Sequence, residues 1–132
     1  MAANPRNIRD VTVQHLCKAR RDVVFRAWTD PKYLAMWWGP HGFDNPRCEA
    51  DPRPGGQILI HMRGPDGRVY PMTGTYREIV KPQRIVFVSS PLDDKGKPMF
   101  EVLSTVSFAE EGDHTRVTVR AQVRTETAGA EQ

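Results

Sequence analysis

From residue 45 onward, short segments with alternating apolar and polar residues follow one another, and this period of two constrains the fold more than any other feature. Runs of glycine, proline and acidic residues separate the segments, for example at 54–56 and 64–67, and such runs form tight turns. Because short turns join neighbouring strands in opposite directions, the pattern predicts an antiparallel meander. The expected strands cover residues 47–51, 57–63, 69–80, 84–89, 99–108 and 115–124.

The alternation also predicts that one face of the sheet is apolar and the other mostly polar. Glu78 has the parity of Gly74 and Tyr76, so we expect its carboxylate on the apolar face, near the end of a strand. At about 25 cal/mol per Å² of apolar surface, burying such a face contributes tens of kcal/mol before opposing terms are counted. The apolar parity holds Ile58, Ile60, Met62, Tyr70, Met72, Gly74, Tyr76, Ile85, Phe87, Phe100, Val102, Ser104, Val106, Phe108, Val117, Val119, Ala121 and Val123.

The N-terminal third mixes one strand with two short helices. Residues 10–17 alternate in the same way and predict a first strand. A helix is expected over 22–28, because its first residue is an aspartate, a good N-cap, and its apolar residues recur three and four apart. A second short helix is expected over 31–37, where Asp30 can cap a proline in first position and a Gly-Pro pair follows.

We expect a single α+β domain over residues 1–132, with a flexible N-terminus at 1–8. Residues 125–132 are typical of the start of a C-terminal helix, which is then missing or incomplete. Two short helices cannot cover the apolar face of the sheet alone. A missing segment or a second copy in a homodimer is therefore expected to cover it.

Composition excludes several classes of protein. The chain has 132 residues, 39% hydrophobic and 27% charged, which is typical of a globular domain. Its net charge is +3, and the excess lies before Cys48, but no basic cluster interleaved with aromatics predicts a nucleic-acid partner. No apolar run reaches the roughly 20 residues of a membrane span, so stable membrane insertion is not expected. The first ten residues lack a secretory apolar stretch and the two cysteines have no metal-binding spacing, which predicts a cytoplasmic protein.

No pattern predicts a metal, a cofactor or a catalytic residue. His15, His41, His61 and His114 lie on different expected elements, with no spacing that would let them share a metal ion. No serine stands in a nucleophile elbow, and the glycine pairs lack the arrangement of a phosphate-binding loop.

Four motifs, in this order, carry a resemblance to a known family. They are VFRAWTDP at 24–31, WWGP at 37–40, DPRPGG at 51–56 and GTYREI at 74–79. With the order of elements over residues 8–124, they make the chain similar to the START-like (SRPBCC) superfamily. Within it, the chain resembles bacterial relatives of the C-terminal domain of the activator of Hsp90 ATPase. The resemblance implies a helix-grip fold, in which a curved antiparallel sheet of six or seven strands wraps around a helix, with an apolar cavity between them.

The resemblance implies that the chain binds a hydrophobic small molecule or lipid in this cavity, without catalysis. Glu78 is expected either to tether a polar ligand group or to pair with an arginine. Because Trp37 and Trp38 are adjacent, one is expected in the core and the other at the rim, as a gate to the cavity or an anchor of the helix pair. The candidate lining residues are Trp37, Trp38, Ile60, Met72, Tyr76, Glu78, Phe87 and Phe100.

Two alternatives remain open. The chain could be a partner of an Hsp90-type chaperone that stimulates its ATPase, contacted through the basic N-terminal third around Arg20 and Arg21. It could instead be an enzyme similar to polyketide cyclases and dehydratases, which requires a buried acid or base. Glu78 is the one candidate for that role.

Overall fold

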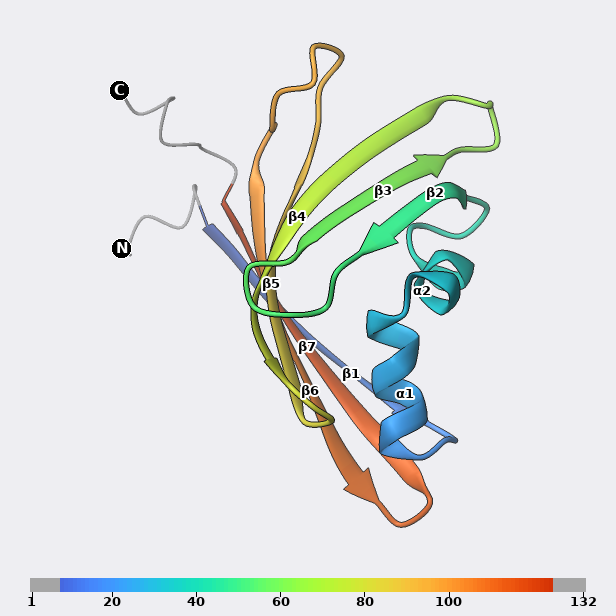
Figure 1. Ribbon diagram of the computed structural model, residues 1–132, viewed down its shortest axis with the longest axis vertical. Helices are drawn as coiled ribbons and strands as arrows, with labels where there is room; N and C mark the ends of the chain where they lie inside the picture. The colour runs from blue at the N-terminus through green and yellow to red at the C-terminus, as the bar shows by residue number, and fades with distance from the viewer. Residues whose placement is uncertain (1–7, 125–132) are drawn as a thin grey trace.

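Seven antiparallel strands form one sheet in the order β1-β7-β6-β5-β4-β3-β2, in a computed structural model that describes residues 8–124 (Figure 1). The predicted α+β helix-grip class is confirmed. The expectations for the first seven residues and for a helix starting at 125–132 lie outside the described residues. The elements are β1 (Ile8–Cys17), α1 (Arg21–Thr29), α2 (Pro31–Trp37), β2 (Asp44–Ala50), β3 (Gln57–Arg63), β4 (Val69–Val80), β5 (Arg84–Pro91), β6 (Glu101–Glu111) and β7 (His114–Arg124).

The sheet curves, and both helices lie on its concave side (Figure 1). α1 contacts β6 and β7, whereas α2 contacts β2 at the opposite edge of the sheet. The predicted apolar parity supplies the core on this side, because residues of that parity from β3 to β7 are buried. The buried apolar residues are Val24, Phe25, Leu34, Ile58, Ile60, Met72, Tyr76, Ile85, Phe87, Val106, Phe108 and Val117.

The two helices meet at Asp30, as the sequence predicts. Its carboxylate accepts a hydrogen bond from the Lys32 backbone N–H at 3.0 Å, and Pro31 occupies the first turn, where no N–H is needed. The expected N-cap of α1 is wrong by two positions. Arg20 is the N-cap, and Asp22 lies in the first turn, where its charge still complements the helix dipole.

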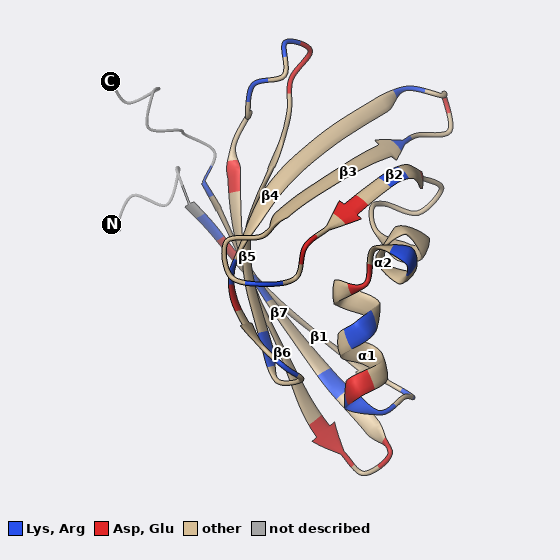
Figure 2. Cartoon of the chain, in the orientation of Figure 1, with Lys and Arg blue, Asp and Glu red and all other residues tan. Residues whose placement is uncertain are grey.

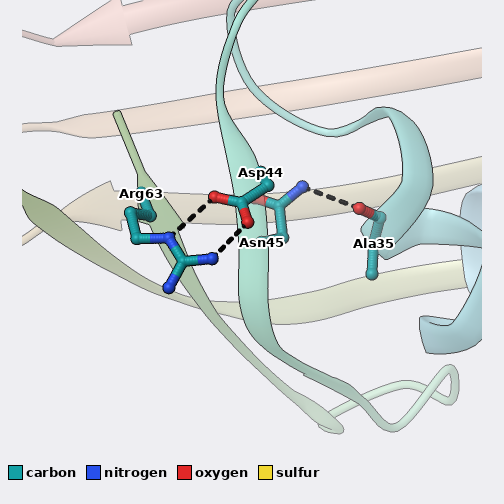
Figure 3. Close-up of polar contacts among 4 residues, drawn as sticks. All are labelled: Ala35, Asp44, Asn45 and Arg63. Carbon is teal, nitrogen blue, oxygen red and sulfur yellow. Dashed lines mark hydrogen bonds and ion pairs between the residues drawn. The ribbon is translucent and has the colours of Figure 1, made fainter. Parts of the chain in front are cut away.

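Asn45 fixes the C-terminal end of α2 to the sheet (Figure 3). Its side-chain Nδ2 donates a hydrogen bond to the Ala35 carbonyl oxygen at 2.9 Å and another to the Trp38 carbonyl oxygen, also at 2.9 Å. These carbonyls would otherwise be left unpaired at the helix end. The preceding residue, Asp44, pairs with the Arg63 guanidinium on β3. α2 and the tryptophans at its end are therefore held at a defined position above β2 and β3.

Candidate functional site

Four of the predicted cavity residues meet on the concave face, but they pack against one another. The rings of Tyr76 and Trp38 each lie 6.3 Å from the ring of Phe87, measured between centroids. The space that remains is about 10 Å³, near the lower limit for one water molecule. This part of the concave face is solid core. It is lined by Trp28, Leu34, Trp38, Ile58, Ile60, Tyr76 and Phe87.

The Tyr76 side chain is shielded from water in this region. Its side chain is almost completely buried, and burial is the main cause that raises the pKa of its phenol to about 12. The nearby Cys48 and Asp51 raise the pKa further through their charge.

The other predicted lining residues lie elsewhere. Met72 is buried in β4 without lining this space. Phe100 precedes β6, which begins at Glu101, so the expected strand over 99–108 starts two residues late. Trp37 lies at the surface, 41% exposed.

The expectation that Glu78 shares the apolar face with Tyr76 is wrong, because β4 contains a bulge. Tyr76 pairs with Phe87 and Glu78 pairs with Val86, so Arg77 is an extra residue that reverses the parity. Glu78 therefore points to the outer face, where its carboxylate accepts a hydrogen bond from the Arg84 guanidinium at 2.9 Å. A partly exposed, ion-paired carboxylate on the outer face cannot reach a ligand on the concave side, which removes the candidate acid or base of the enzyme alternative.

An open groove of about 570 Å³ lies on the other half of the concave face. One wall comes from α1 and the end of α2, and the other comes from β1 and β7. His15 contributes the polar side chain of the lining, because the Gln14 amide lies on the outer face, where it donates a hydrogen bond to Thr118 Oγ1. We name this feature the β1–β7 groove. Its lining comprises Val13, Gln14, His15, Cys17, Ala19, Val23, Val24, Ala27, Trp28, Trp37, Val117 and Val119.

Two tryptophans form the helical wall of the β1–β7 groove. The ring centroids of Trp28 and Trp37 are 4.5 Å apart in an edge-to-face arrangement. The Trp37 indole Nε1–H donates to the Ala27 carbonyl oxygen at 2.9 Å, so its polar group is satisfied and its hydrocarbon surface remains free for contact. Trp38 instead packs on Phe87 in the core. The adjacent tryptophans thus divide between rim and core, as their positions predict.

Several charged side chains on the polar outer face of the sheet form ion pairs, whereas basic residues outnumber acidic ones in the helical segment (Figure 2). Arg120, Arg63 and Arg116 hydrogen-bond to Asp10, Asp44 and Glu111, and these bonds lower the pKa of each carboxyl. Segment 18–37, which contains both helices, carries five basic and two acidic residues. Its excess of three positive charges equals the net charge of the whole chain.

The described residues offer little else for chemistry. Burial raises the pKa of the Cys17 thiol, and burial with the nearby Glu49 raises that of Cys48, so both thiols are protonated and weakly nucleophilic at neutral pH. Within residues 8–124, no three histidine, cysteine or acidic side chains come together as a metal site would require. In the same part of the chain, neither helix has the length and apolar character needed to cross a bilayer.

Comparison with known proteins supports the fold and the resemblance. A family model described as "Activator of Hsp90 ATPase homolog 1-like protein" matches residues 18–132. No curated protein matches the sequence. An uncharacterized protein from Rhizobium leguminosarum is similar in structure, with 26% identity and a TM-score of 0.77 over 88% of this chain and 76% of that chain.

Two further solved structures agree. A protein from Rhizobium loti has 26% identity and a TM-score of 0.76, covering 92% of this chain and 82% of its own. A Silicibacter pomeroyi protein described as AHSA1 has 21% identity and a TM-score of 0.78, covering 86% of this chain and 78% of its own, which supports the fold alone.

Proposed function

We propose that this chain, which belongs to the Activator of Hsp90 ATPase homolog 1-like family, binds a hydrophobic small molecule or lipid chain in the β1–β7 groove. The fold of the family suggests ligand binding or ATPase activation. The observation that carries this proposal is that the groove combines the volume of a small-molecule site with an apolar lining. A volume of about 570 Å³ falls within the roughly 300–1,000 Å³ of small-molecule sites. Ten of the twelve lining residues are apolar or a cysteine.

The lining also indicates what kind of molecule fits. Val13, Val117 and Val119 from the sheet face Val23 and Trp37 from the helices, so both walls offer hydrocarbon. Each buried methylene of a ligand contributes about 0.8 kcal/mol against such walls. No lysine, arginine or carboxylate lines the groove, so an alkyl or isoprenoid chain is favoured over a highly charged metabolite.

The same lining supports binding without turnover. The only titratable side chains in the lining are the Cys17 thiol and the His15 imidazole, and His15 is exposed. General acid–base catalysis needs a proton-transferring group held in a fixed relation to the substrate and to a partner that orients it. Binding is therefore the simpler activity for these residues.

Three dodecyl compounds test the proposal: dodecanol, dodecanoate and dodecylamine share one chain and differ in charge. We expect each to raise the melting temperature in a concentration-dependent way and to change the fluorescence of Trp28 and Trp37. A ligand at one hundred times its Kd stabilises the native state by about 2.7 kcal/mol. If none of the three shifts the melting temperature up to its solubility limit, the proposal is wrong.

A second candidate function is stimulation of a chaperone ATPase, and one observation favours it. The excess positive charge is concentrated in segment 18–37, as expected of a surface that attracts an acidic partner. Arg20→Glu tests it better than a change at Arg21, because the Arg21 guanidinium lies near Glu110 at 3.8 Å and its Nε is buried. The addition of this protein should raise the Hsp90 ATPase rate, and Arg20→Glu should reduce the effect. An unchanged rate contradicts this candidate.

A further inference from the structure

A second hollow, of about 350 Å³, lies between α1 and α2 and adjoins the β1–β7 groove, with which it shares Val23, Ala27 and Trp37. One turn of α1 and one turn of α2 supply its walls, with side chains three and four residues apart on each helix. We name it the α1–α2 hollow. Its lining is Val23, Arg26, Ala27, Tyr33, Met36 and Trp37.

Four large apolar side chains that line the α1–α2 hollow are exposed. Met36 is 77% exposed and Val23 is 54% exposed, and the exposed faces of Tyr33 and Trp37 adjoin them. Tryptophan, tyrosine and arginine dominate the energetically important positions of protein interfaces, and methionine is enriched there. The composition of this small hollow is therefore that of an interface centre.

The walls of the hollow are held in place before any partner arrives. The Trp37 indole is fixed by its hydrogen bond to the Ala27 carbonyl oxygen and by its contact with Trp28. The start of α2 is capped by Asp30, and its end is held by Asn45. A preorganised surface loses little side-chain entropy on binding.

The positive charge around the hollow favours an acidic partner. Arg26 lines the hollow and forms no ion pair within residues 8–124. Lys32 lies one turn before Met36 on α2 and has no ion pair in the described chain either. One of the two carboxylates in segment 18–37, that of Asp30, accepts the cap hydrogen bond of α2. The surroundings of the hollow are thus positive, and an acidic partner is complementary to them.

We propose that the α1–α2 hollow docks an acidic amphipathic helix of a partner protein. Apolar side chains three or four residues apart on that helix contact Met36 and Trp37, and its flanking carboxylates pair with Arg26 and Lys32. This inference deepens the partner-binding candidate above. The hollow shares Val23, Ala27 and Trp37 with the β1–β7 groove, whereas Arg26 and Met36 line the hollow alone and therefore test it separately. A second copy of the chain is a poor occupant, because a two-fold interface through this hollow would bring the same positive charges together.

Two synthetic peptides test the proposal. Both have the same length and the same leucine face at helical spacing, but the polar face carries glutamate in one and lysine in the other. Fluorescence anisotropy should show the glutamate peptide binding roughly tenfold more tightly, with the difference shrinking as salt increases. Arg26→Glu should reverse the preference, and Met36→Ala should weaken both peptides.

Arg77→Glu is the matched control, because Arg77 is an exposed arginine at the β4 bulge, on a different element from the hollow. It should leave the preference unchanged. Each variant is first checked for the wild-type unfolding transition, and Arg26→Gln replaces Arg26→Glu if the latter fails to fold.

Three results would overturn the proposal: equal affinity for the two peptides, an equal effect of the Arg26 and Arg77 variants, or displacement of the glutamate peptide by anionic phosphatidylserine vesicles. Dodecanol binding is measured on the same variants and should be unaffected by Arg26→Glu. Failure of peptide docking is thus distinguishable from failure of ligand binding.

Discussion

The two halves of the concave face differ although one sequence pattern produces both. In the half made by β3, β4 and β5, Ile60, Tyr76 and Phe87 are buried beneath Trp38. In the half made by β1 and β7, Val13 has the same inward parity but is 58% exposed. Alternation thus determines which side chains point inward, whereas coverage by another element determines which of them are buried.

The difference arises from where the helices make contact. α2 is held over β2 by Asn45 and brings Trp38 onto Phe87. α1 packs on β6 and β7, while β1 at the edge of the sheet pairs with β7 alone. Stability is therefore expected to depend on the packed half, and ligand binding on the open half.

The largest expected effect is on stability, from truncation in the packed half. Phe87→Ala removes a 5%-exposed aromatic ring and should lower the free energy of unfolding by about 3–5 kcal/mol, because the surrounding side chains cannot fill the cavity. Val13→Ala, at an exposed position of the open half, should change it by about 0.5 kcal/mol or less. Urea denaturation measures both. Equal losses would show that the two halves do not differ.

At high pH, the stability of the packed half is expected to depend on the protonation of Tyr76. Tyr76 has a pKa of about 12 in the folded chain and an ordinary value of 10. As the pH rises, Tyr76 loses its proton in the unfolded chain before it does so in the folded chain. The stability that the protonated phenol contributes is therefore fully present below pH 10 and is lost as the pH rises through 12. Two pKa units correspond to roughly 3 kcal/mol.

Tyr76→Phe is the control for this loss, because phenylalanine keeps the buried ring and has no proton to lose. The variant should retain stability between pH 10 and 12 better than the wild type does. If both proteins lose the same stability over this interval, Tyr76 is not the cause.

Filling the open half should weaken ligand binding with little effect on stability. Val13→Trp places an indole in the β1–β7 groove and should lower the affinity for dodecanol by at least tenfold, which is about 1.4 kcal/mol. Thr12→Trp is the matched control, because Thr12 pairs with Arg120 on the polar face of the same strand. Titration calorimetry compares them, and an equal effect of the two variants would place the ligand elsewhere.

The smallest expected effect is on thiol reactivity. Both cysteines pack against the core and both thiols have raised pKa values, but only Cys17 lines the groove. Bound dodecanol should slow the alkylation of Cys17 severalfold and leave Cys48 unchanged, because only Cys17 is covered. Mass spectrometry of iodoacetamide-treated protein at alkaline pH measures both rates, and equal protection of the two thiols would argue against the groove.

The sequence predicts the fold well because alternation and turn residues are local signals. The seven strands, the cap at Asp30 and the division of Trp37 and Trp38 between rim and core follow from them. The side of the sheet on which Glu78 lies does not follow, because a one-residue bulge at Arg77 reverses the parity and has no distinct signal in that strand.

The site itself is predicted only in part. The largest apolar residues, such as Phe87 and Tyr76, are natural candidates for a cavity lining, but large side chains are also those that fill space most completely. The valines of β1 and β7 have the correct parity. Their exposure depends on α1 leaving β1 uncovered, which is a tertiary contact that no local pattern encodes.

The most direct test of the division between packed and open halves is a titration of ¹⁵N-labelled protein with dodecanol, followed through the three tryptophan indole N–H signals by NMR. We expect the signals of Trp28 and Trp37 to shift in a saturable way, while that of Trp38 moves least. A largest shift at Trp38, or no saturable shift at any of the three, would contradict this division.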